Sequence, residues 1–131
     1  MKKIRIGNDF VLLWAVERNN SPEDLTTIGN AKLKVKVFNV TKEIPFEIVD
    51  TNKLRIEFTP EICNTIGTYN LKFSYTLPDE GLSDFERECT IDCDAFTIVS
   101  ASAQADDSSD FSVTSDMAIG FKGDKGDKGD S

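Results

Sequence analysis

The chain contains no histidine, and it has only three cysteines and one tryptophan. Without histidine, neither a Ser-His nor a Cys-His pair can form, so the usual base of nucleophilic catalysis is absent. Cys63, Cys89 and Cys93 are odd in number, form no CxxC pair and have no histidine to complete a zinc set. In one strand, Cys89 and Cys93 would lie about 13 Å apart, too far for a disulfide. We therefore expect reduced, apolar cysteines, no metal, no cofactor and no enzymatic activity.

Long apolar runs are also missing. No stretch approaches the roughly 20 residues that a membrane helix requires, and Met1-Lys2-Lys3 is followed by alternation instead of the apolar region of a signal peptide. The net charge is −8 at pH 7, which repels nucleic acid because phosphate binding needs a basic face. The sequence thus predicts no membrane segment, no signal peptide and no nucleic-acid partner.

What the sequence does contain, over residues 1–100, is period-two alternation in short runs. Residues 32–37, 53–58 and 70–75 each alternate charged or polar side chains with apolar ones, as in antiparallel sheets with one solvated face. Turn signals separate the runs, at 19–22, 28–30, 50–52, 64–67 and 78–81. The spacing predicts an all-β antiparallel β-sandwich of about seven or eight strands.

Residues 10–16 are more continuously apolar, which indicates a strand that is covered on both sides or meets a partner. Trp14 lies in this run, and Tyr69 and Tyr75 also sit in apolar alternation, so all three rings are predicted to be core anchors. Residues 85–99 are expected to form the last strand pair or one long bent strand. The carboxylate pairs within it, Glu86 with Glu88 and Asp92 with Asp94, are interpreted as a solvated row and not as catalytic acids.

After Ser100 the alternation stops. Residues 101–119 are rich in Ser, Ala and Asp with isolated Phe111, Val113 and Met117, a composition that buries too little surface to order itself alone. We interpret 101–119 as an acidic linker between a β-sandwich domain, 1–100, and a third region, 120–131. Part of the linker, from Phe111 to Ile119, could dock on a partner copy.

The third region is four triplets with glycine in strict third position, at Gly120, Gly123, Gly126 and Gly129. Three chains wound together leave room only for a hydrogen at their axis, so this spacing is typical of a collagen-like triple helix and predicts a homotrimer. A flexible Gly/Lys/Asp linker is the alternative, and it would match two triplets by chance far more easily than four. Four triplets without proline are too few for a stable triple helix alone, so we expect the repeat to continue in a longer polypeptide.

The order of features in 1–100 resembles the N-terminal domain of phage baseplate upper proteins and related tail-fibre proteins. The segments that carry this resemblance are 6–9, 21–26, 31–38, 67–73 and 94–99. The resemblance implies an immunoglobulin-like sandwich that fixes a receptor-binding fibre to the tail as a trimer, and phage fibres commonly use collagen-like repeats as shafts. It implies no particular site residues.

The resemblance, together with the glycine repeat, implies a virion structural protein that would be made in the bacterial cytoplasm and located in the tail. The sandwich would bind other tail or baseplate proteins through an exposed sheet face or an edge strand, and the repeat would begin a shaft. Two alternatives remain open: a carbohydrate-binding sandwich, which needs exposed aromatic rings on one face, and a bacterial cell-surface adhesin on a collagen-like stalk.

Overall fold

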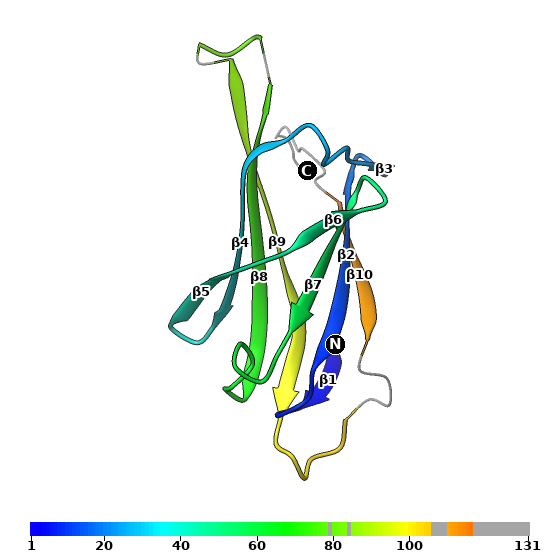
Figure 1. The fold of residues 1–131 in the computed structure, drawn as a ribbon, viewed down its shortest axis with the longest axis vertical. Helices are drawn as coiled ribbons and strands as arrows, with labels where there is room; N and C mark the ends of the chain where they lie inside the picture. The colour runs from blue at the N-terminus through cyan, green and yellow to red at the C-terminus, as the bar shows by residue number, and fades with distance from the viewer. Residues whose placement is uncertain (79, 84, 106–109, 117–131) are drawn as a thin grey trace, which may run out of the picture.

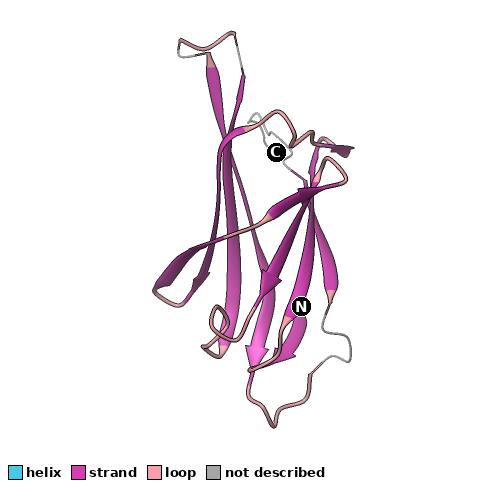
Figure 2. Ribbon diagram, in the orientation of Figure 1, coloured by secondary structure: helices cyan, strands magenta, loops and turns pink. Residues whose placement is uncertain are grey.

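The computed structural model describes residues 1–78, 80–83, 85–105 and 110–116. Over these residues the regular secondary structure is strand throughout (Figure 2). Ten strands form two sheets that face each other (Figure 1). Within the described part of the chain, no helix is long and apolar enough to cross a membrane. The prediction of an all-β fold is confirmed, and the two sheets agree with a β-sandwich.

The first sheet has five strands in the order β1-β9-β8-β4-β5. The pair β1 and β9 is parallel, and the other neighbours are antiparallel. Its strands are β1 (Lys2–Arg5), β4 (Gly29–Val37), β5 (Val40–Ile44), β8 (Gly67–Pro78) and β9 (Glu86–Val99). Of the two forms expected for residues 85–99, the structure therefore has the single long strand, which shifts register with β8 between Tyr69 and Asn70.

The second sheet has the order β10-β2-β7-β6, with the short strand β3 also paired to β2. Its strands are β2 (Phe10–Arg18), β3 (Ser21–Pro22), β6 (Glu47–Val49), β7 (Lys53–Phe58) and β10 (Phe111–Asp116). The strand β2, which contains the most continuous apolar run, has β7 on one side and β10 on the other. The apolar residues between its core positions lie on the outward face of the sheet and are half-buried.

The core lies between the sheets, where alternate residues of both point inward. Trp14 and Tyr69 are fully buried and Tyr75 is 2% exposed, which confirms all three as core residues. Aromatic rings join the sheets: Phe96 of the first sheet lies 5.0 Å from Phe10 and 4.9 Å from Phe58 of the second, between ring centroids. Burying each large apolar side chain contributes about 1.5–3 kcal/mol, so this layer provides most of the drive to fold.

Turn residues adopt the conformations that their chemistry favours. Asn19, Asn20, Asn30 and Asp50 have φ angles of 53°, 66°, 51° and 50°, in the left-handed region that Asn and Asp tolerate best among non-glycine residues. All four lie where the sequence signals turns. Gly67 has a φ of 152°, and a Cβ added there would lie 3.0 Å from the Phe38 ring, so the position needs glycine both for its backbone angle and for its close contact.

The main difference from the sequence prediction lies within residues 101–119, which were expected to be a linker. Phe111–Asp116 is instead strand β10, paired in parallel with β2 over its whole length. Its few apolar side chains, Phe111 and Val113, pack against the core that 1–100 already provides. The composition argument judged the segment alone, whereas a preformed sheet edge supplies the hydrogen bonds and apolar surface that the segment lacks. The sandwich therefore extends to Asp116.

Candidate functional site

The most distinctive surface is the outward face of the first sheet. In β4 the apolar residues between the lysines point into the core, so Lys32, Lys34 and Lys36 all point outward and are exposed. Alternation forces this arrangement, because successive residues of a strand face opposite sides. Lys72 of β8 lies directly opposite Lys34 on the same face. A basic row thus follows β4 and reaches β8.

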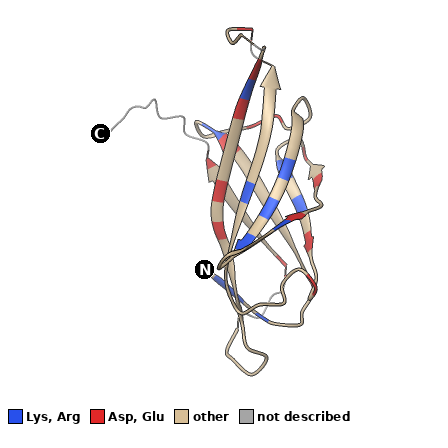
Figure 3. Ribbon diagram, turned by 90° about the vertical axis from the view of Figure 1, so that its left-hand side faces the viewer, with Lys and Arg blue, Asp and Glu red and all other residues tan. Residues whose placement is uncertain are grey.

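An acidic row follows β9 on the same face. Glu88, Asp92 and Asp94 occupy outward positions, alternating with residues that point into the sandwich. Asp92 lies opposite Lys72 across the β8–β9 pairing, and Asp94 accepts a hydrogen bond of 3.2 Å from the amide nitrogen of Asn70. Figure 3 shows the blue positions of β4 and the red positions of β9 on either side of β8. The carboxylates form the solvated row that the sequence predicted, and the structure adds that a basic row runs parallel to it.

A shallow hollow of about 590 Å³ lies between the two rows. Its lining consists of Lys34, Lys36, Thr41, Asn70, Lys72, Asp92 and Asp94. Among the described residues, the three lysines and Asp92 make no ion pair within 4.0 Å. Lys34 and Lys72 are directly opposite, a like-charge pair of the kind that destabilises a sheet. Each has a carboxylate on its other side, Glu43 of β5 opposite Lys34 and Asp92 of β9 opposite Lys72, which partly offsets the repulsion. Over the residues that the structure describes, the lining of the hollow is charged or polar and contains no aromatic ring.

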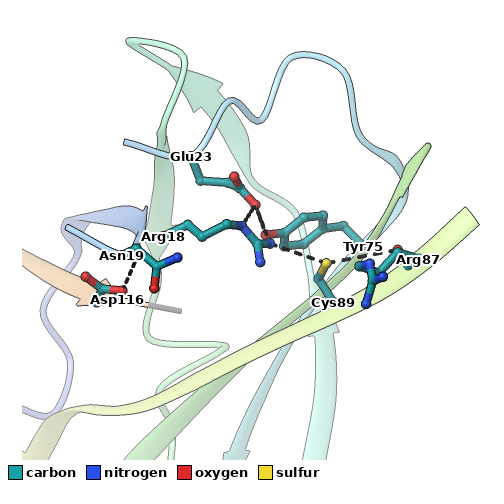
Figure 4. A network of polar contacts seen from close by, with 7 residues as sticks. All are labelled: Arg18, Asn19, Glu23, Tyr75, Arg87, Cys89 and Asp116. Carbon is teal, nitrogen blue, oxygen red and sulfur yellow. Dashed lines mark hydrogen bonds and ion pairs between the residues drawn. The ribbon is translucent and has the colours of Figure 1, made fainter. Parts of the chain in front are cut away.

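A second polar cluster lies inside one end of the sandwich and joins the two sheets (Figure 4). The Arg18 guanidinium, at the end of β2, donates to Glu23 Oε2 from Nη2 at 2.7 Å and from Nε at 3.1 Å. The Tyr75 hydroxyl, from β8, donates to the same oxygen at 2.8 Å. Arg18 Nη2 also lies 3.5 Å from Cys89 Sγ of β9. Glu23 is only 9% exposed, so these bonds replace the water that its carboxylate loses.

The protonation states of this cluster are fixed. Burial alone would raise the pKa of Glu23, but the hydrogen bonds from Arg18 and Tyr75 outweigh it and the pKa is lowered. Burial, and then the bond to Glu23, raise the pKa of Tyr75, and the bond to Glu23 is the largest factor that raises the pKa of Arg18. All three shifts favour the charge states that these hydrogen bonds need, an ionised Glu23 and Arg18 and a neutral Tyr75, so the cluster can link the two sheets at neutral pH.

The cysteines are all free, with Cys63 and Cys89 buried and Cys93 half-buried. Burial raises the pKa of the Cys63 thiol to about 12 and also raises that of Cys93. A thiol with a raised pKa is a poor nucleophile and a poor metal ligand, because both roles need the thiolate. The described residues contain no group of three or more His, Cys, Asp or Glu side chains placed to hold a metal ion.

A third set of contacts anchors β10, the strand that precedes the glycine repeat. The Trp14 indole Nε1 donates to Ser115 Oγ at 2.8 Å, and the Asp116 carboxylate accepts from the backbone N–H groups of Asn19 and Asn20 at 2.9 and 2.7 Å. At the other end of the strand, Asp110 Oδ1 accepts from the backbone N–H of Val11 at 2.9 Å. Two of the acidic residues of the predicted linker, Asp110 and Asp116, are thus hydrogen-bond acceptors that hold β10 against β2 and the turn after it.

The predicted site residues Gly120, Gly123, Gly126 and Gly129 lie outside the described residues. Sequence reasoning did not identify the pair Arg18 and Glu23, because their burial depends on Tyr75 from the other sheet. It also missed the anchors of β10, which lie in a polar segment and bond to residues far away in the sequence. The alternation did indicate the lysine row, but nothing in it indicates which strand lies beside β4. No protein-family model matches the chain, and no curated protein matches it either.

Proposed function

We propose that this chain is a non-enzymatic structural protein of a phage or prophage virion. Its immunoglobulin-like sandwich would be the N-terminal attachment domain of a trimeric tail fibre or baseplate protein, and its glycine repeat would begin a collagen-like shaft. The observation that carries the proposal is the strict glycine spacing from Gly120, because only a triple helix demands a residue without a side chain at every third position.

The position of β10 supports this arrangement. Asp116 ends the sandwich, and only three residues separate it from Gly120. A fibre must transmit force between its shaft and its attachment domain, and the last strand before the repeat is fastened by ladder bonds to β2 and by the side chains of Trp14, Asp110 and Asp116. The repeat therefore follows a strand that is built into a sheet, instead of a free tail.

The charged face supports a binding role for the sandwich. This face offers exposed lysines and carboxylates over several strands. In the separate buried cluster, the pKa shifts move Arg18, Glu23 and Tyr75 away from titration near neutral pH. An extended charged surface without an activated nucleophile suits attachment to a protein partner. Tail or baseplate proteins would be the partners under this proposal.

The carbohydrate-binding alternative receives less support. A sugar-binding face normally presents aromatic rings, but Trp14, Tyr69 and Tyr75 are buried in the core and the hollow is lined by charged and polar side chains. A bacterial adhesin on a collagen-like stalk would have the same order of regions. The two are separated by location: a virion protein is found by mass spectrometry in purified phage particles, and an adhesin is found in the cell envelope.

The assembly is tested by the mass in solution of three forms of the full chain, measured by light scattering at low temperature over a wide concentration range. The first is the natural sequence, whose four triplets are expected to give a weak assembly of three 14.5 kDa chains, or a multiple of three, populated at high concentration. The second carries Gly123→Ala and Gly126→Ala, which place methyl groups at the crowded axis and should abolish trimers.

The matched control carries Asp124→Ala and Asp127→Ala, which change the same triplets but keep every glycine. It should still form trimers, although the loss of charge pairs between chains should make those trimers weaker. If the natural chain assembles and the two glycine substitutions leave its mass unchanged, the triple-helical shaft is wrong. Truncation at Ser100 is unsuitable as a control because it would remove β10 from the sandwich.

A further inference from the structure

The outward face of the first sheet separates its charges by sign. Lys32, Lys34 and Lys36 follow β4, whereas Glu88, Asp92 and Asp94 follow β9, and β8 lies between them (Figure 3). A uniformly acidic partner would be repelled by the β9 row, and a uniformly basic partner by the β4 row. The face fits a partner that presents the same two rows in the opposite order.

A second copy of this chain is such a partner. We propose that this face is an interface between two copies related by a twofold axis that runs along β8. In a twofold contact the same patch is used by both subunits, so a residue that contacts another is matched by the reciprocal pair. A rotation of 180° about a line along β8 exchanges the positions of β4 and β9. The basic row of each copy then lies over the acidic row of the other.

The strand register makes the match residue by residue. Lys34, Lys72 and Asp92 lie opposite one another on β4, β8 and β9 and so form one transverse row. Lys36, Asn70 and Asp94 form the next row. An axis along β8 keeps each row at its own height, so Lys34 meets Asp92 of the partner subunit.

By the same operation, Lys36 meets Asp94 of the partner subunit, and each of these two contacts occurs twice. Within the described residues, neither lysine has an ion-pair partner of its own chain within 4.0 Å. Lys36 lies between the uncharged side chains of Thr41 and Asn70, so it has the greater need of a carboxylate from outside. Lys34 lies opposite Glu43 of β5, so a partner's carboxylate there would be its second. The long lysine side chains of the second copy can lie in the hollow between the rows, so the outward faces of the two copies can come close together.

Lys72 gives the sharpest prediction of where the axis lies. Its place on β8 puts it against Lys72 of the partner subunit, a like-charge contact that its own neighbour Asp92 only partly offsets. Lys72→Thr should therefore tighten the dimer, although it removes a surface charge that would assist a generic acidic partner. Threonine suits an exposed strand position, so the sheet is preserved.

The contact is tested in the full chain that carries Gly123→Ala and Gly126→Ala, where assembly through the repeat is removed. Sedimentation equilibrium should show a dimer that weakens as salt is raised, because exposed charge pairs are screened. Two variants reverse one row each: Lys34→Asp with Lys36→Asp, and Asp92→Lys with Asp94→Lys. Each alone should raise the dimer Kd about a hundredfold, since like charges then face each other.

An equimolar mixture of the two reversed variants provides the decisive measurement, because one brings only acidic rows and the other only basic ones. The mixture should form a heterodimer at least as tight as the natural dimer, which also shows that both variants are folded. Lys53→Asp is the control: this lysine lies on β7 in the other sheet, and its reversal should leave the dimer unchanged.

A chain that stays monomeric in the glycine-substituted background, or a mixture that binds no better than its components, overturns the twofold contact. A dimer whose Kd is unchanged in both charge-reversed variants overturns it as well. These results are independent of the shaft: loss of the trimer without loss of this dimer would count against the proposed function alone, and a trimer of the natural chain without this dimer would count against the face alone.

Discussion

Removing the hydroxyl of Ser115 tests whether β10 belongs to the sandwich. This hydroxyl accepts a hydrogen bond of 2.8 Å from the Nε1 of Trp14, a residue with no exposed surface. In Ser115→Ala, the indole N–H stays buried without its acceptor, which costs about 1–3 kcal/mol of unfolding free energy. Ser115 itself is half-buried, so some water can enter, and we expect about 1–2 kcal/mol on that scale.

The measurement is urea unfolding followed by circular dichroism, where a loss of this size shifts the midpoint by about 1 M or less. Ser112→Ala is the matched control, because Ser112 lies on the same strand but is exposed. It should change the free energy of unfolding by less than about 0.5 kcal/mol, as is usual for surface substitutions. The natural chain can also be followed by fluorescence, since Trp14 is its only tryptophan.

A double-mutant cycle isolates the bond between the two side chains. In a Trp14→Phe background there is no indole N–H to satisfy, so Ser115→Ala should cost less than about 0.5 kcal/mol there, leaving a coupling energy of about 1 kcal/mol. Equal costs in both backgrounds, or no cost in either, would refute the docking of β10 against Trp14. Burial raises the pKa of the Cys93 thiol, and its hydrogen bond with Ser115 offsets part of that rise. Labelling of Cys93 at alkaline pH should therefore slow in Ser115→Ala.

Two further substitutions test the buried cluster and the tight turn. The pKa of Glu23 lies below its ordinary value of 4.5, so the stability from its carboxylate is fully present above that pH and is lost as the pH falls through the lowered pKa. Glu23→Gln should therefore lower stability at neutral pH and flatten its decline in acid, as urea unfolding over a pH series would show; an unchanged slope would contradict the ion pair. Gly67→Ala should cost about 1–3 kcal/mol through its left-handed φ and its clash with Phe38. In thermal unfolding, Gly7→Ala, which has a positive φ but nothing within 4 Å, should cost less.

Much of the fold follows from the sequence because strand alternation is a local signal. Burial of Trp14, Tyr69 and Tyr75 was predictable from their apolar neighbours, and the left-handed turn at Asn19 and Asn20 from its composition. The ten strands exceed the expected number because β3 has only two residues, and because the alternation of β10 is brief and lies in a segment rich in Ser and Asp. Such strands are stabilised by the sheet edge that they join.

Polar contacts that depend on strands far apart in the sequence could not be predicted in the same way. Arg18 and Glu23 are close in sequence, but their burial depends on Tyr75 from a strand of the other sheet. A charged residue near a turn is usually solvated, so its sequence gives no sign of burial. The same holds for Asp116, whose two backbone partners are fixed only once β10 lies beside β2.

The charged face shows where local and long-range information meet. The alternation of β4 determines that its lysines share one side of a strand, and the spacing of Asp92 and Asp94 does the same for β9. Neither pattern says that a single strand separates them, because that depends on β8 pairing with both β4 and β9. Once those pairings exist, two rows that look like ordinary solvated faces become a surface with one basic and one acidic side. The physical reason to consider a partner is therefore the arrangement of the rows, which only the sheet order creates, and not the number of charges.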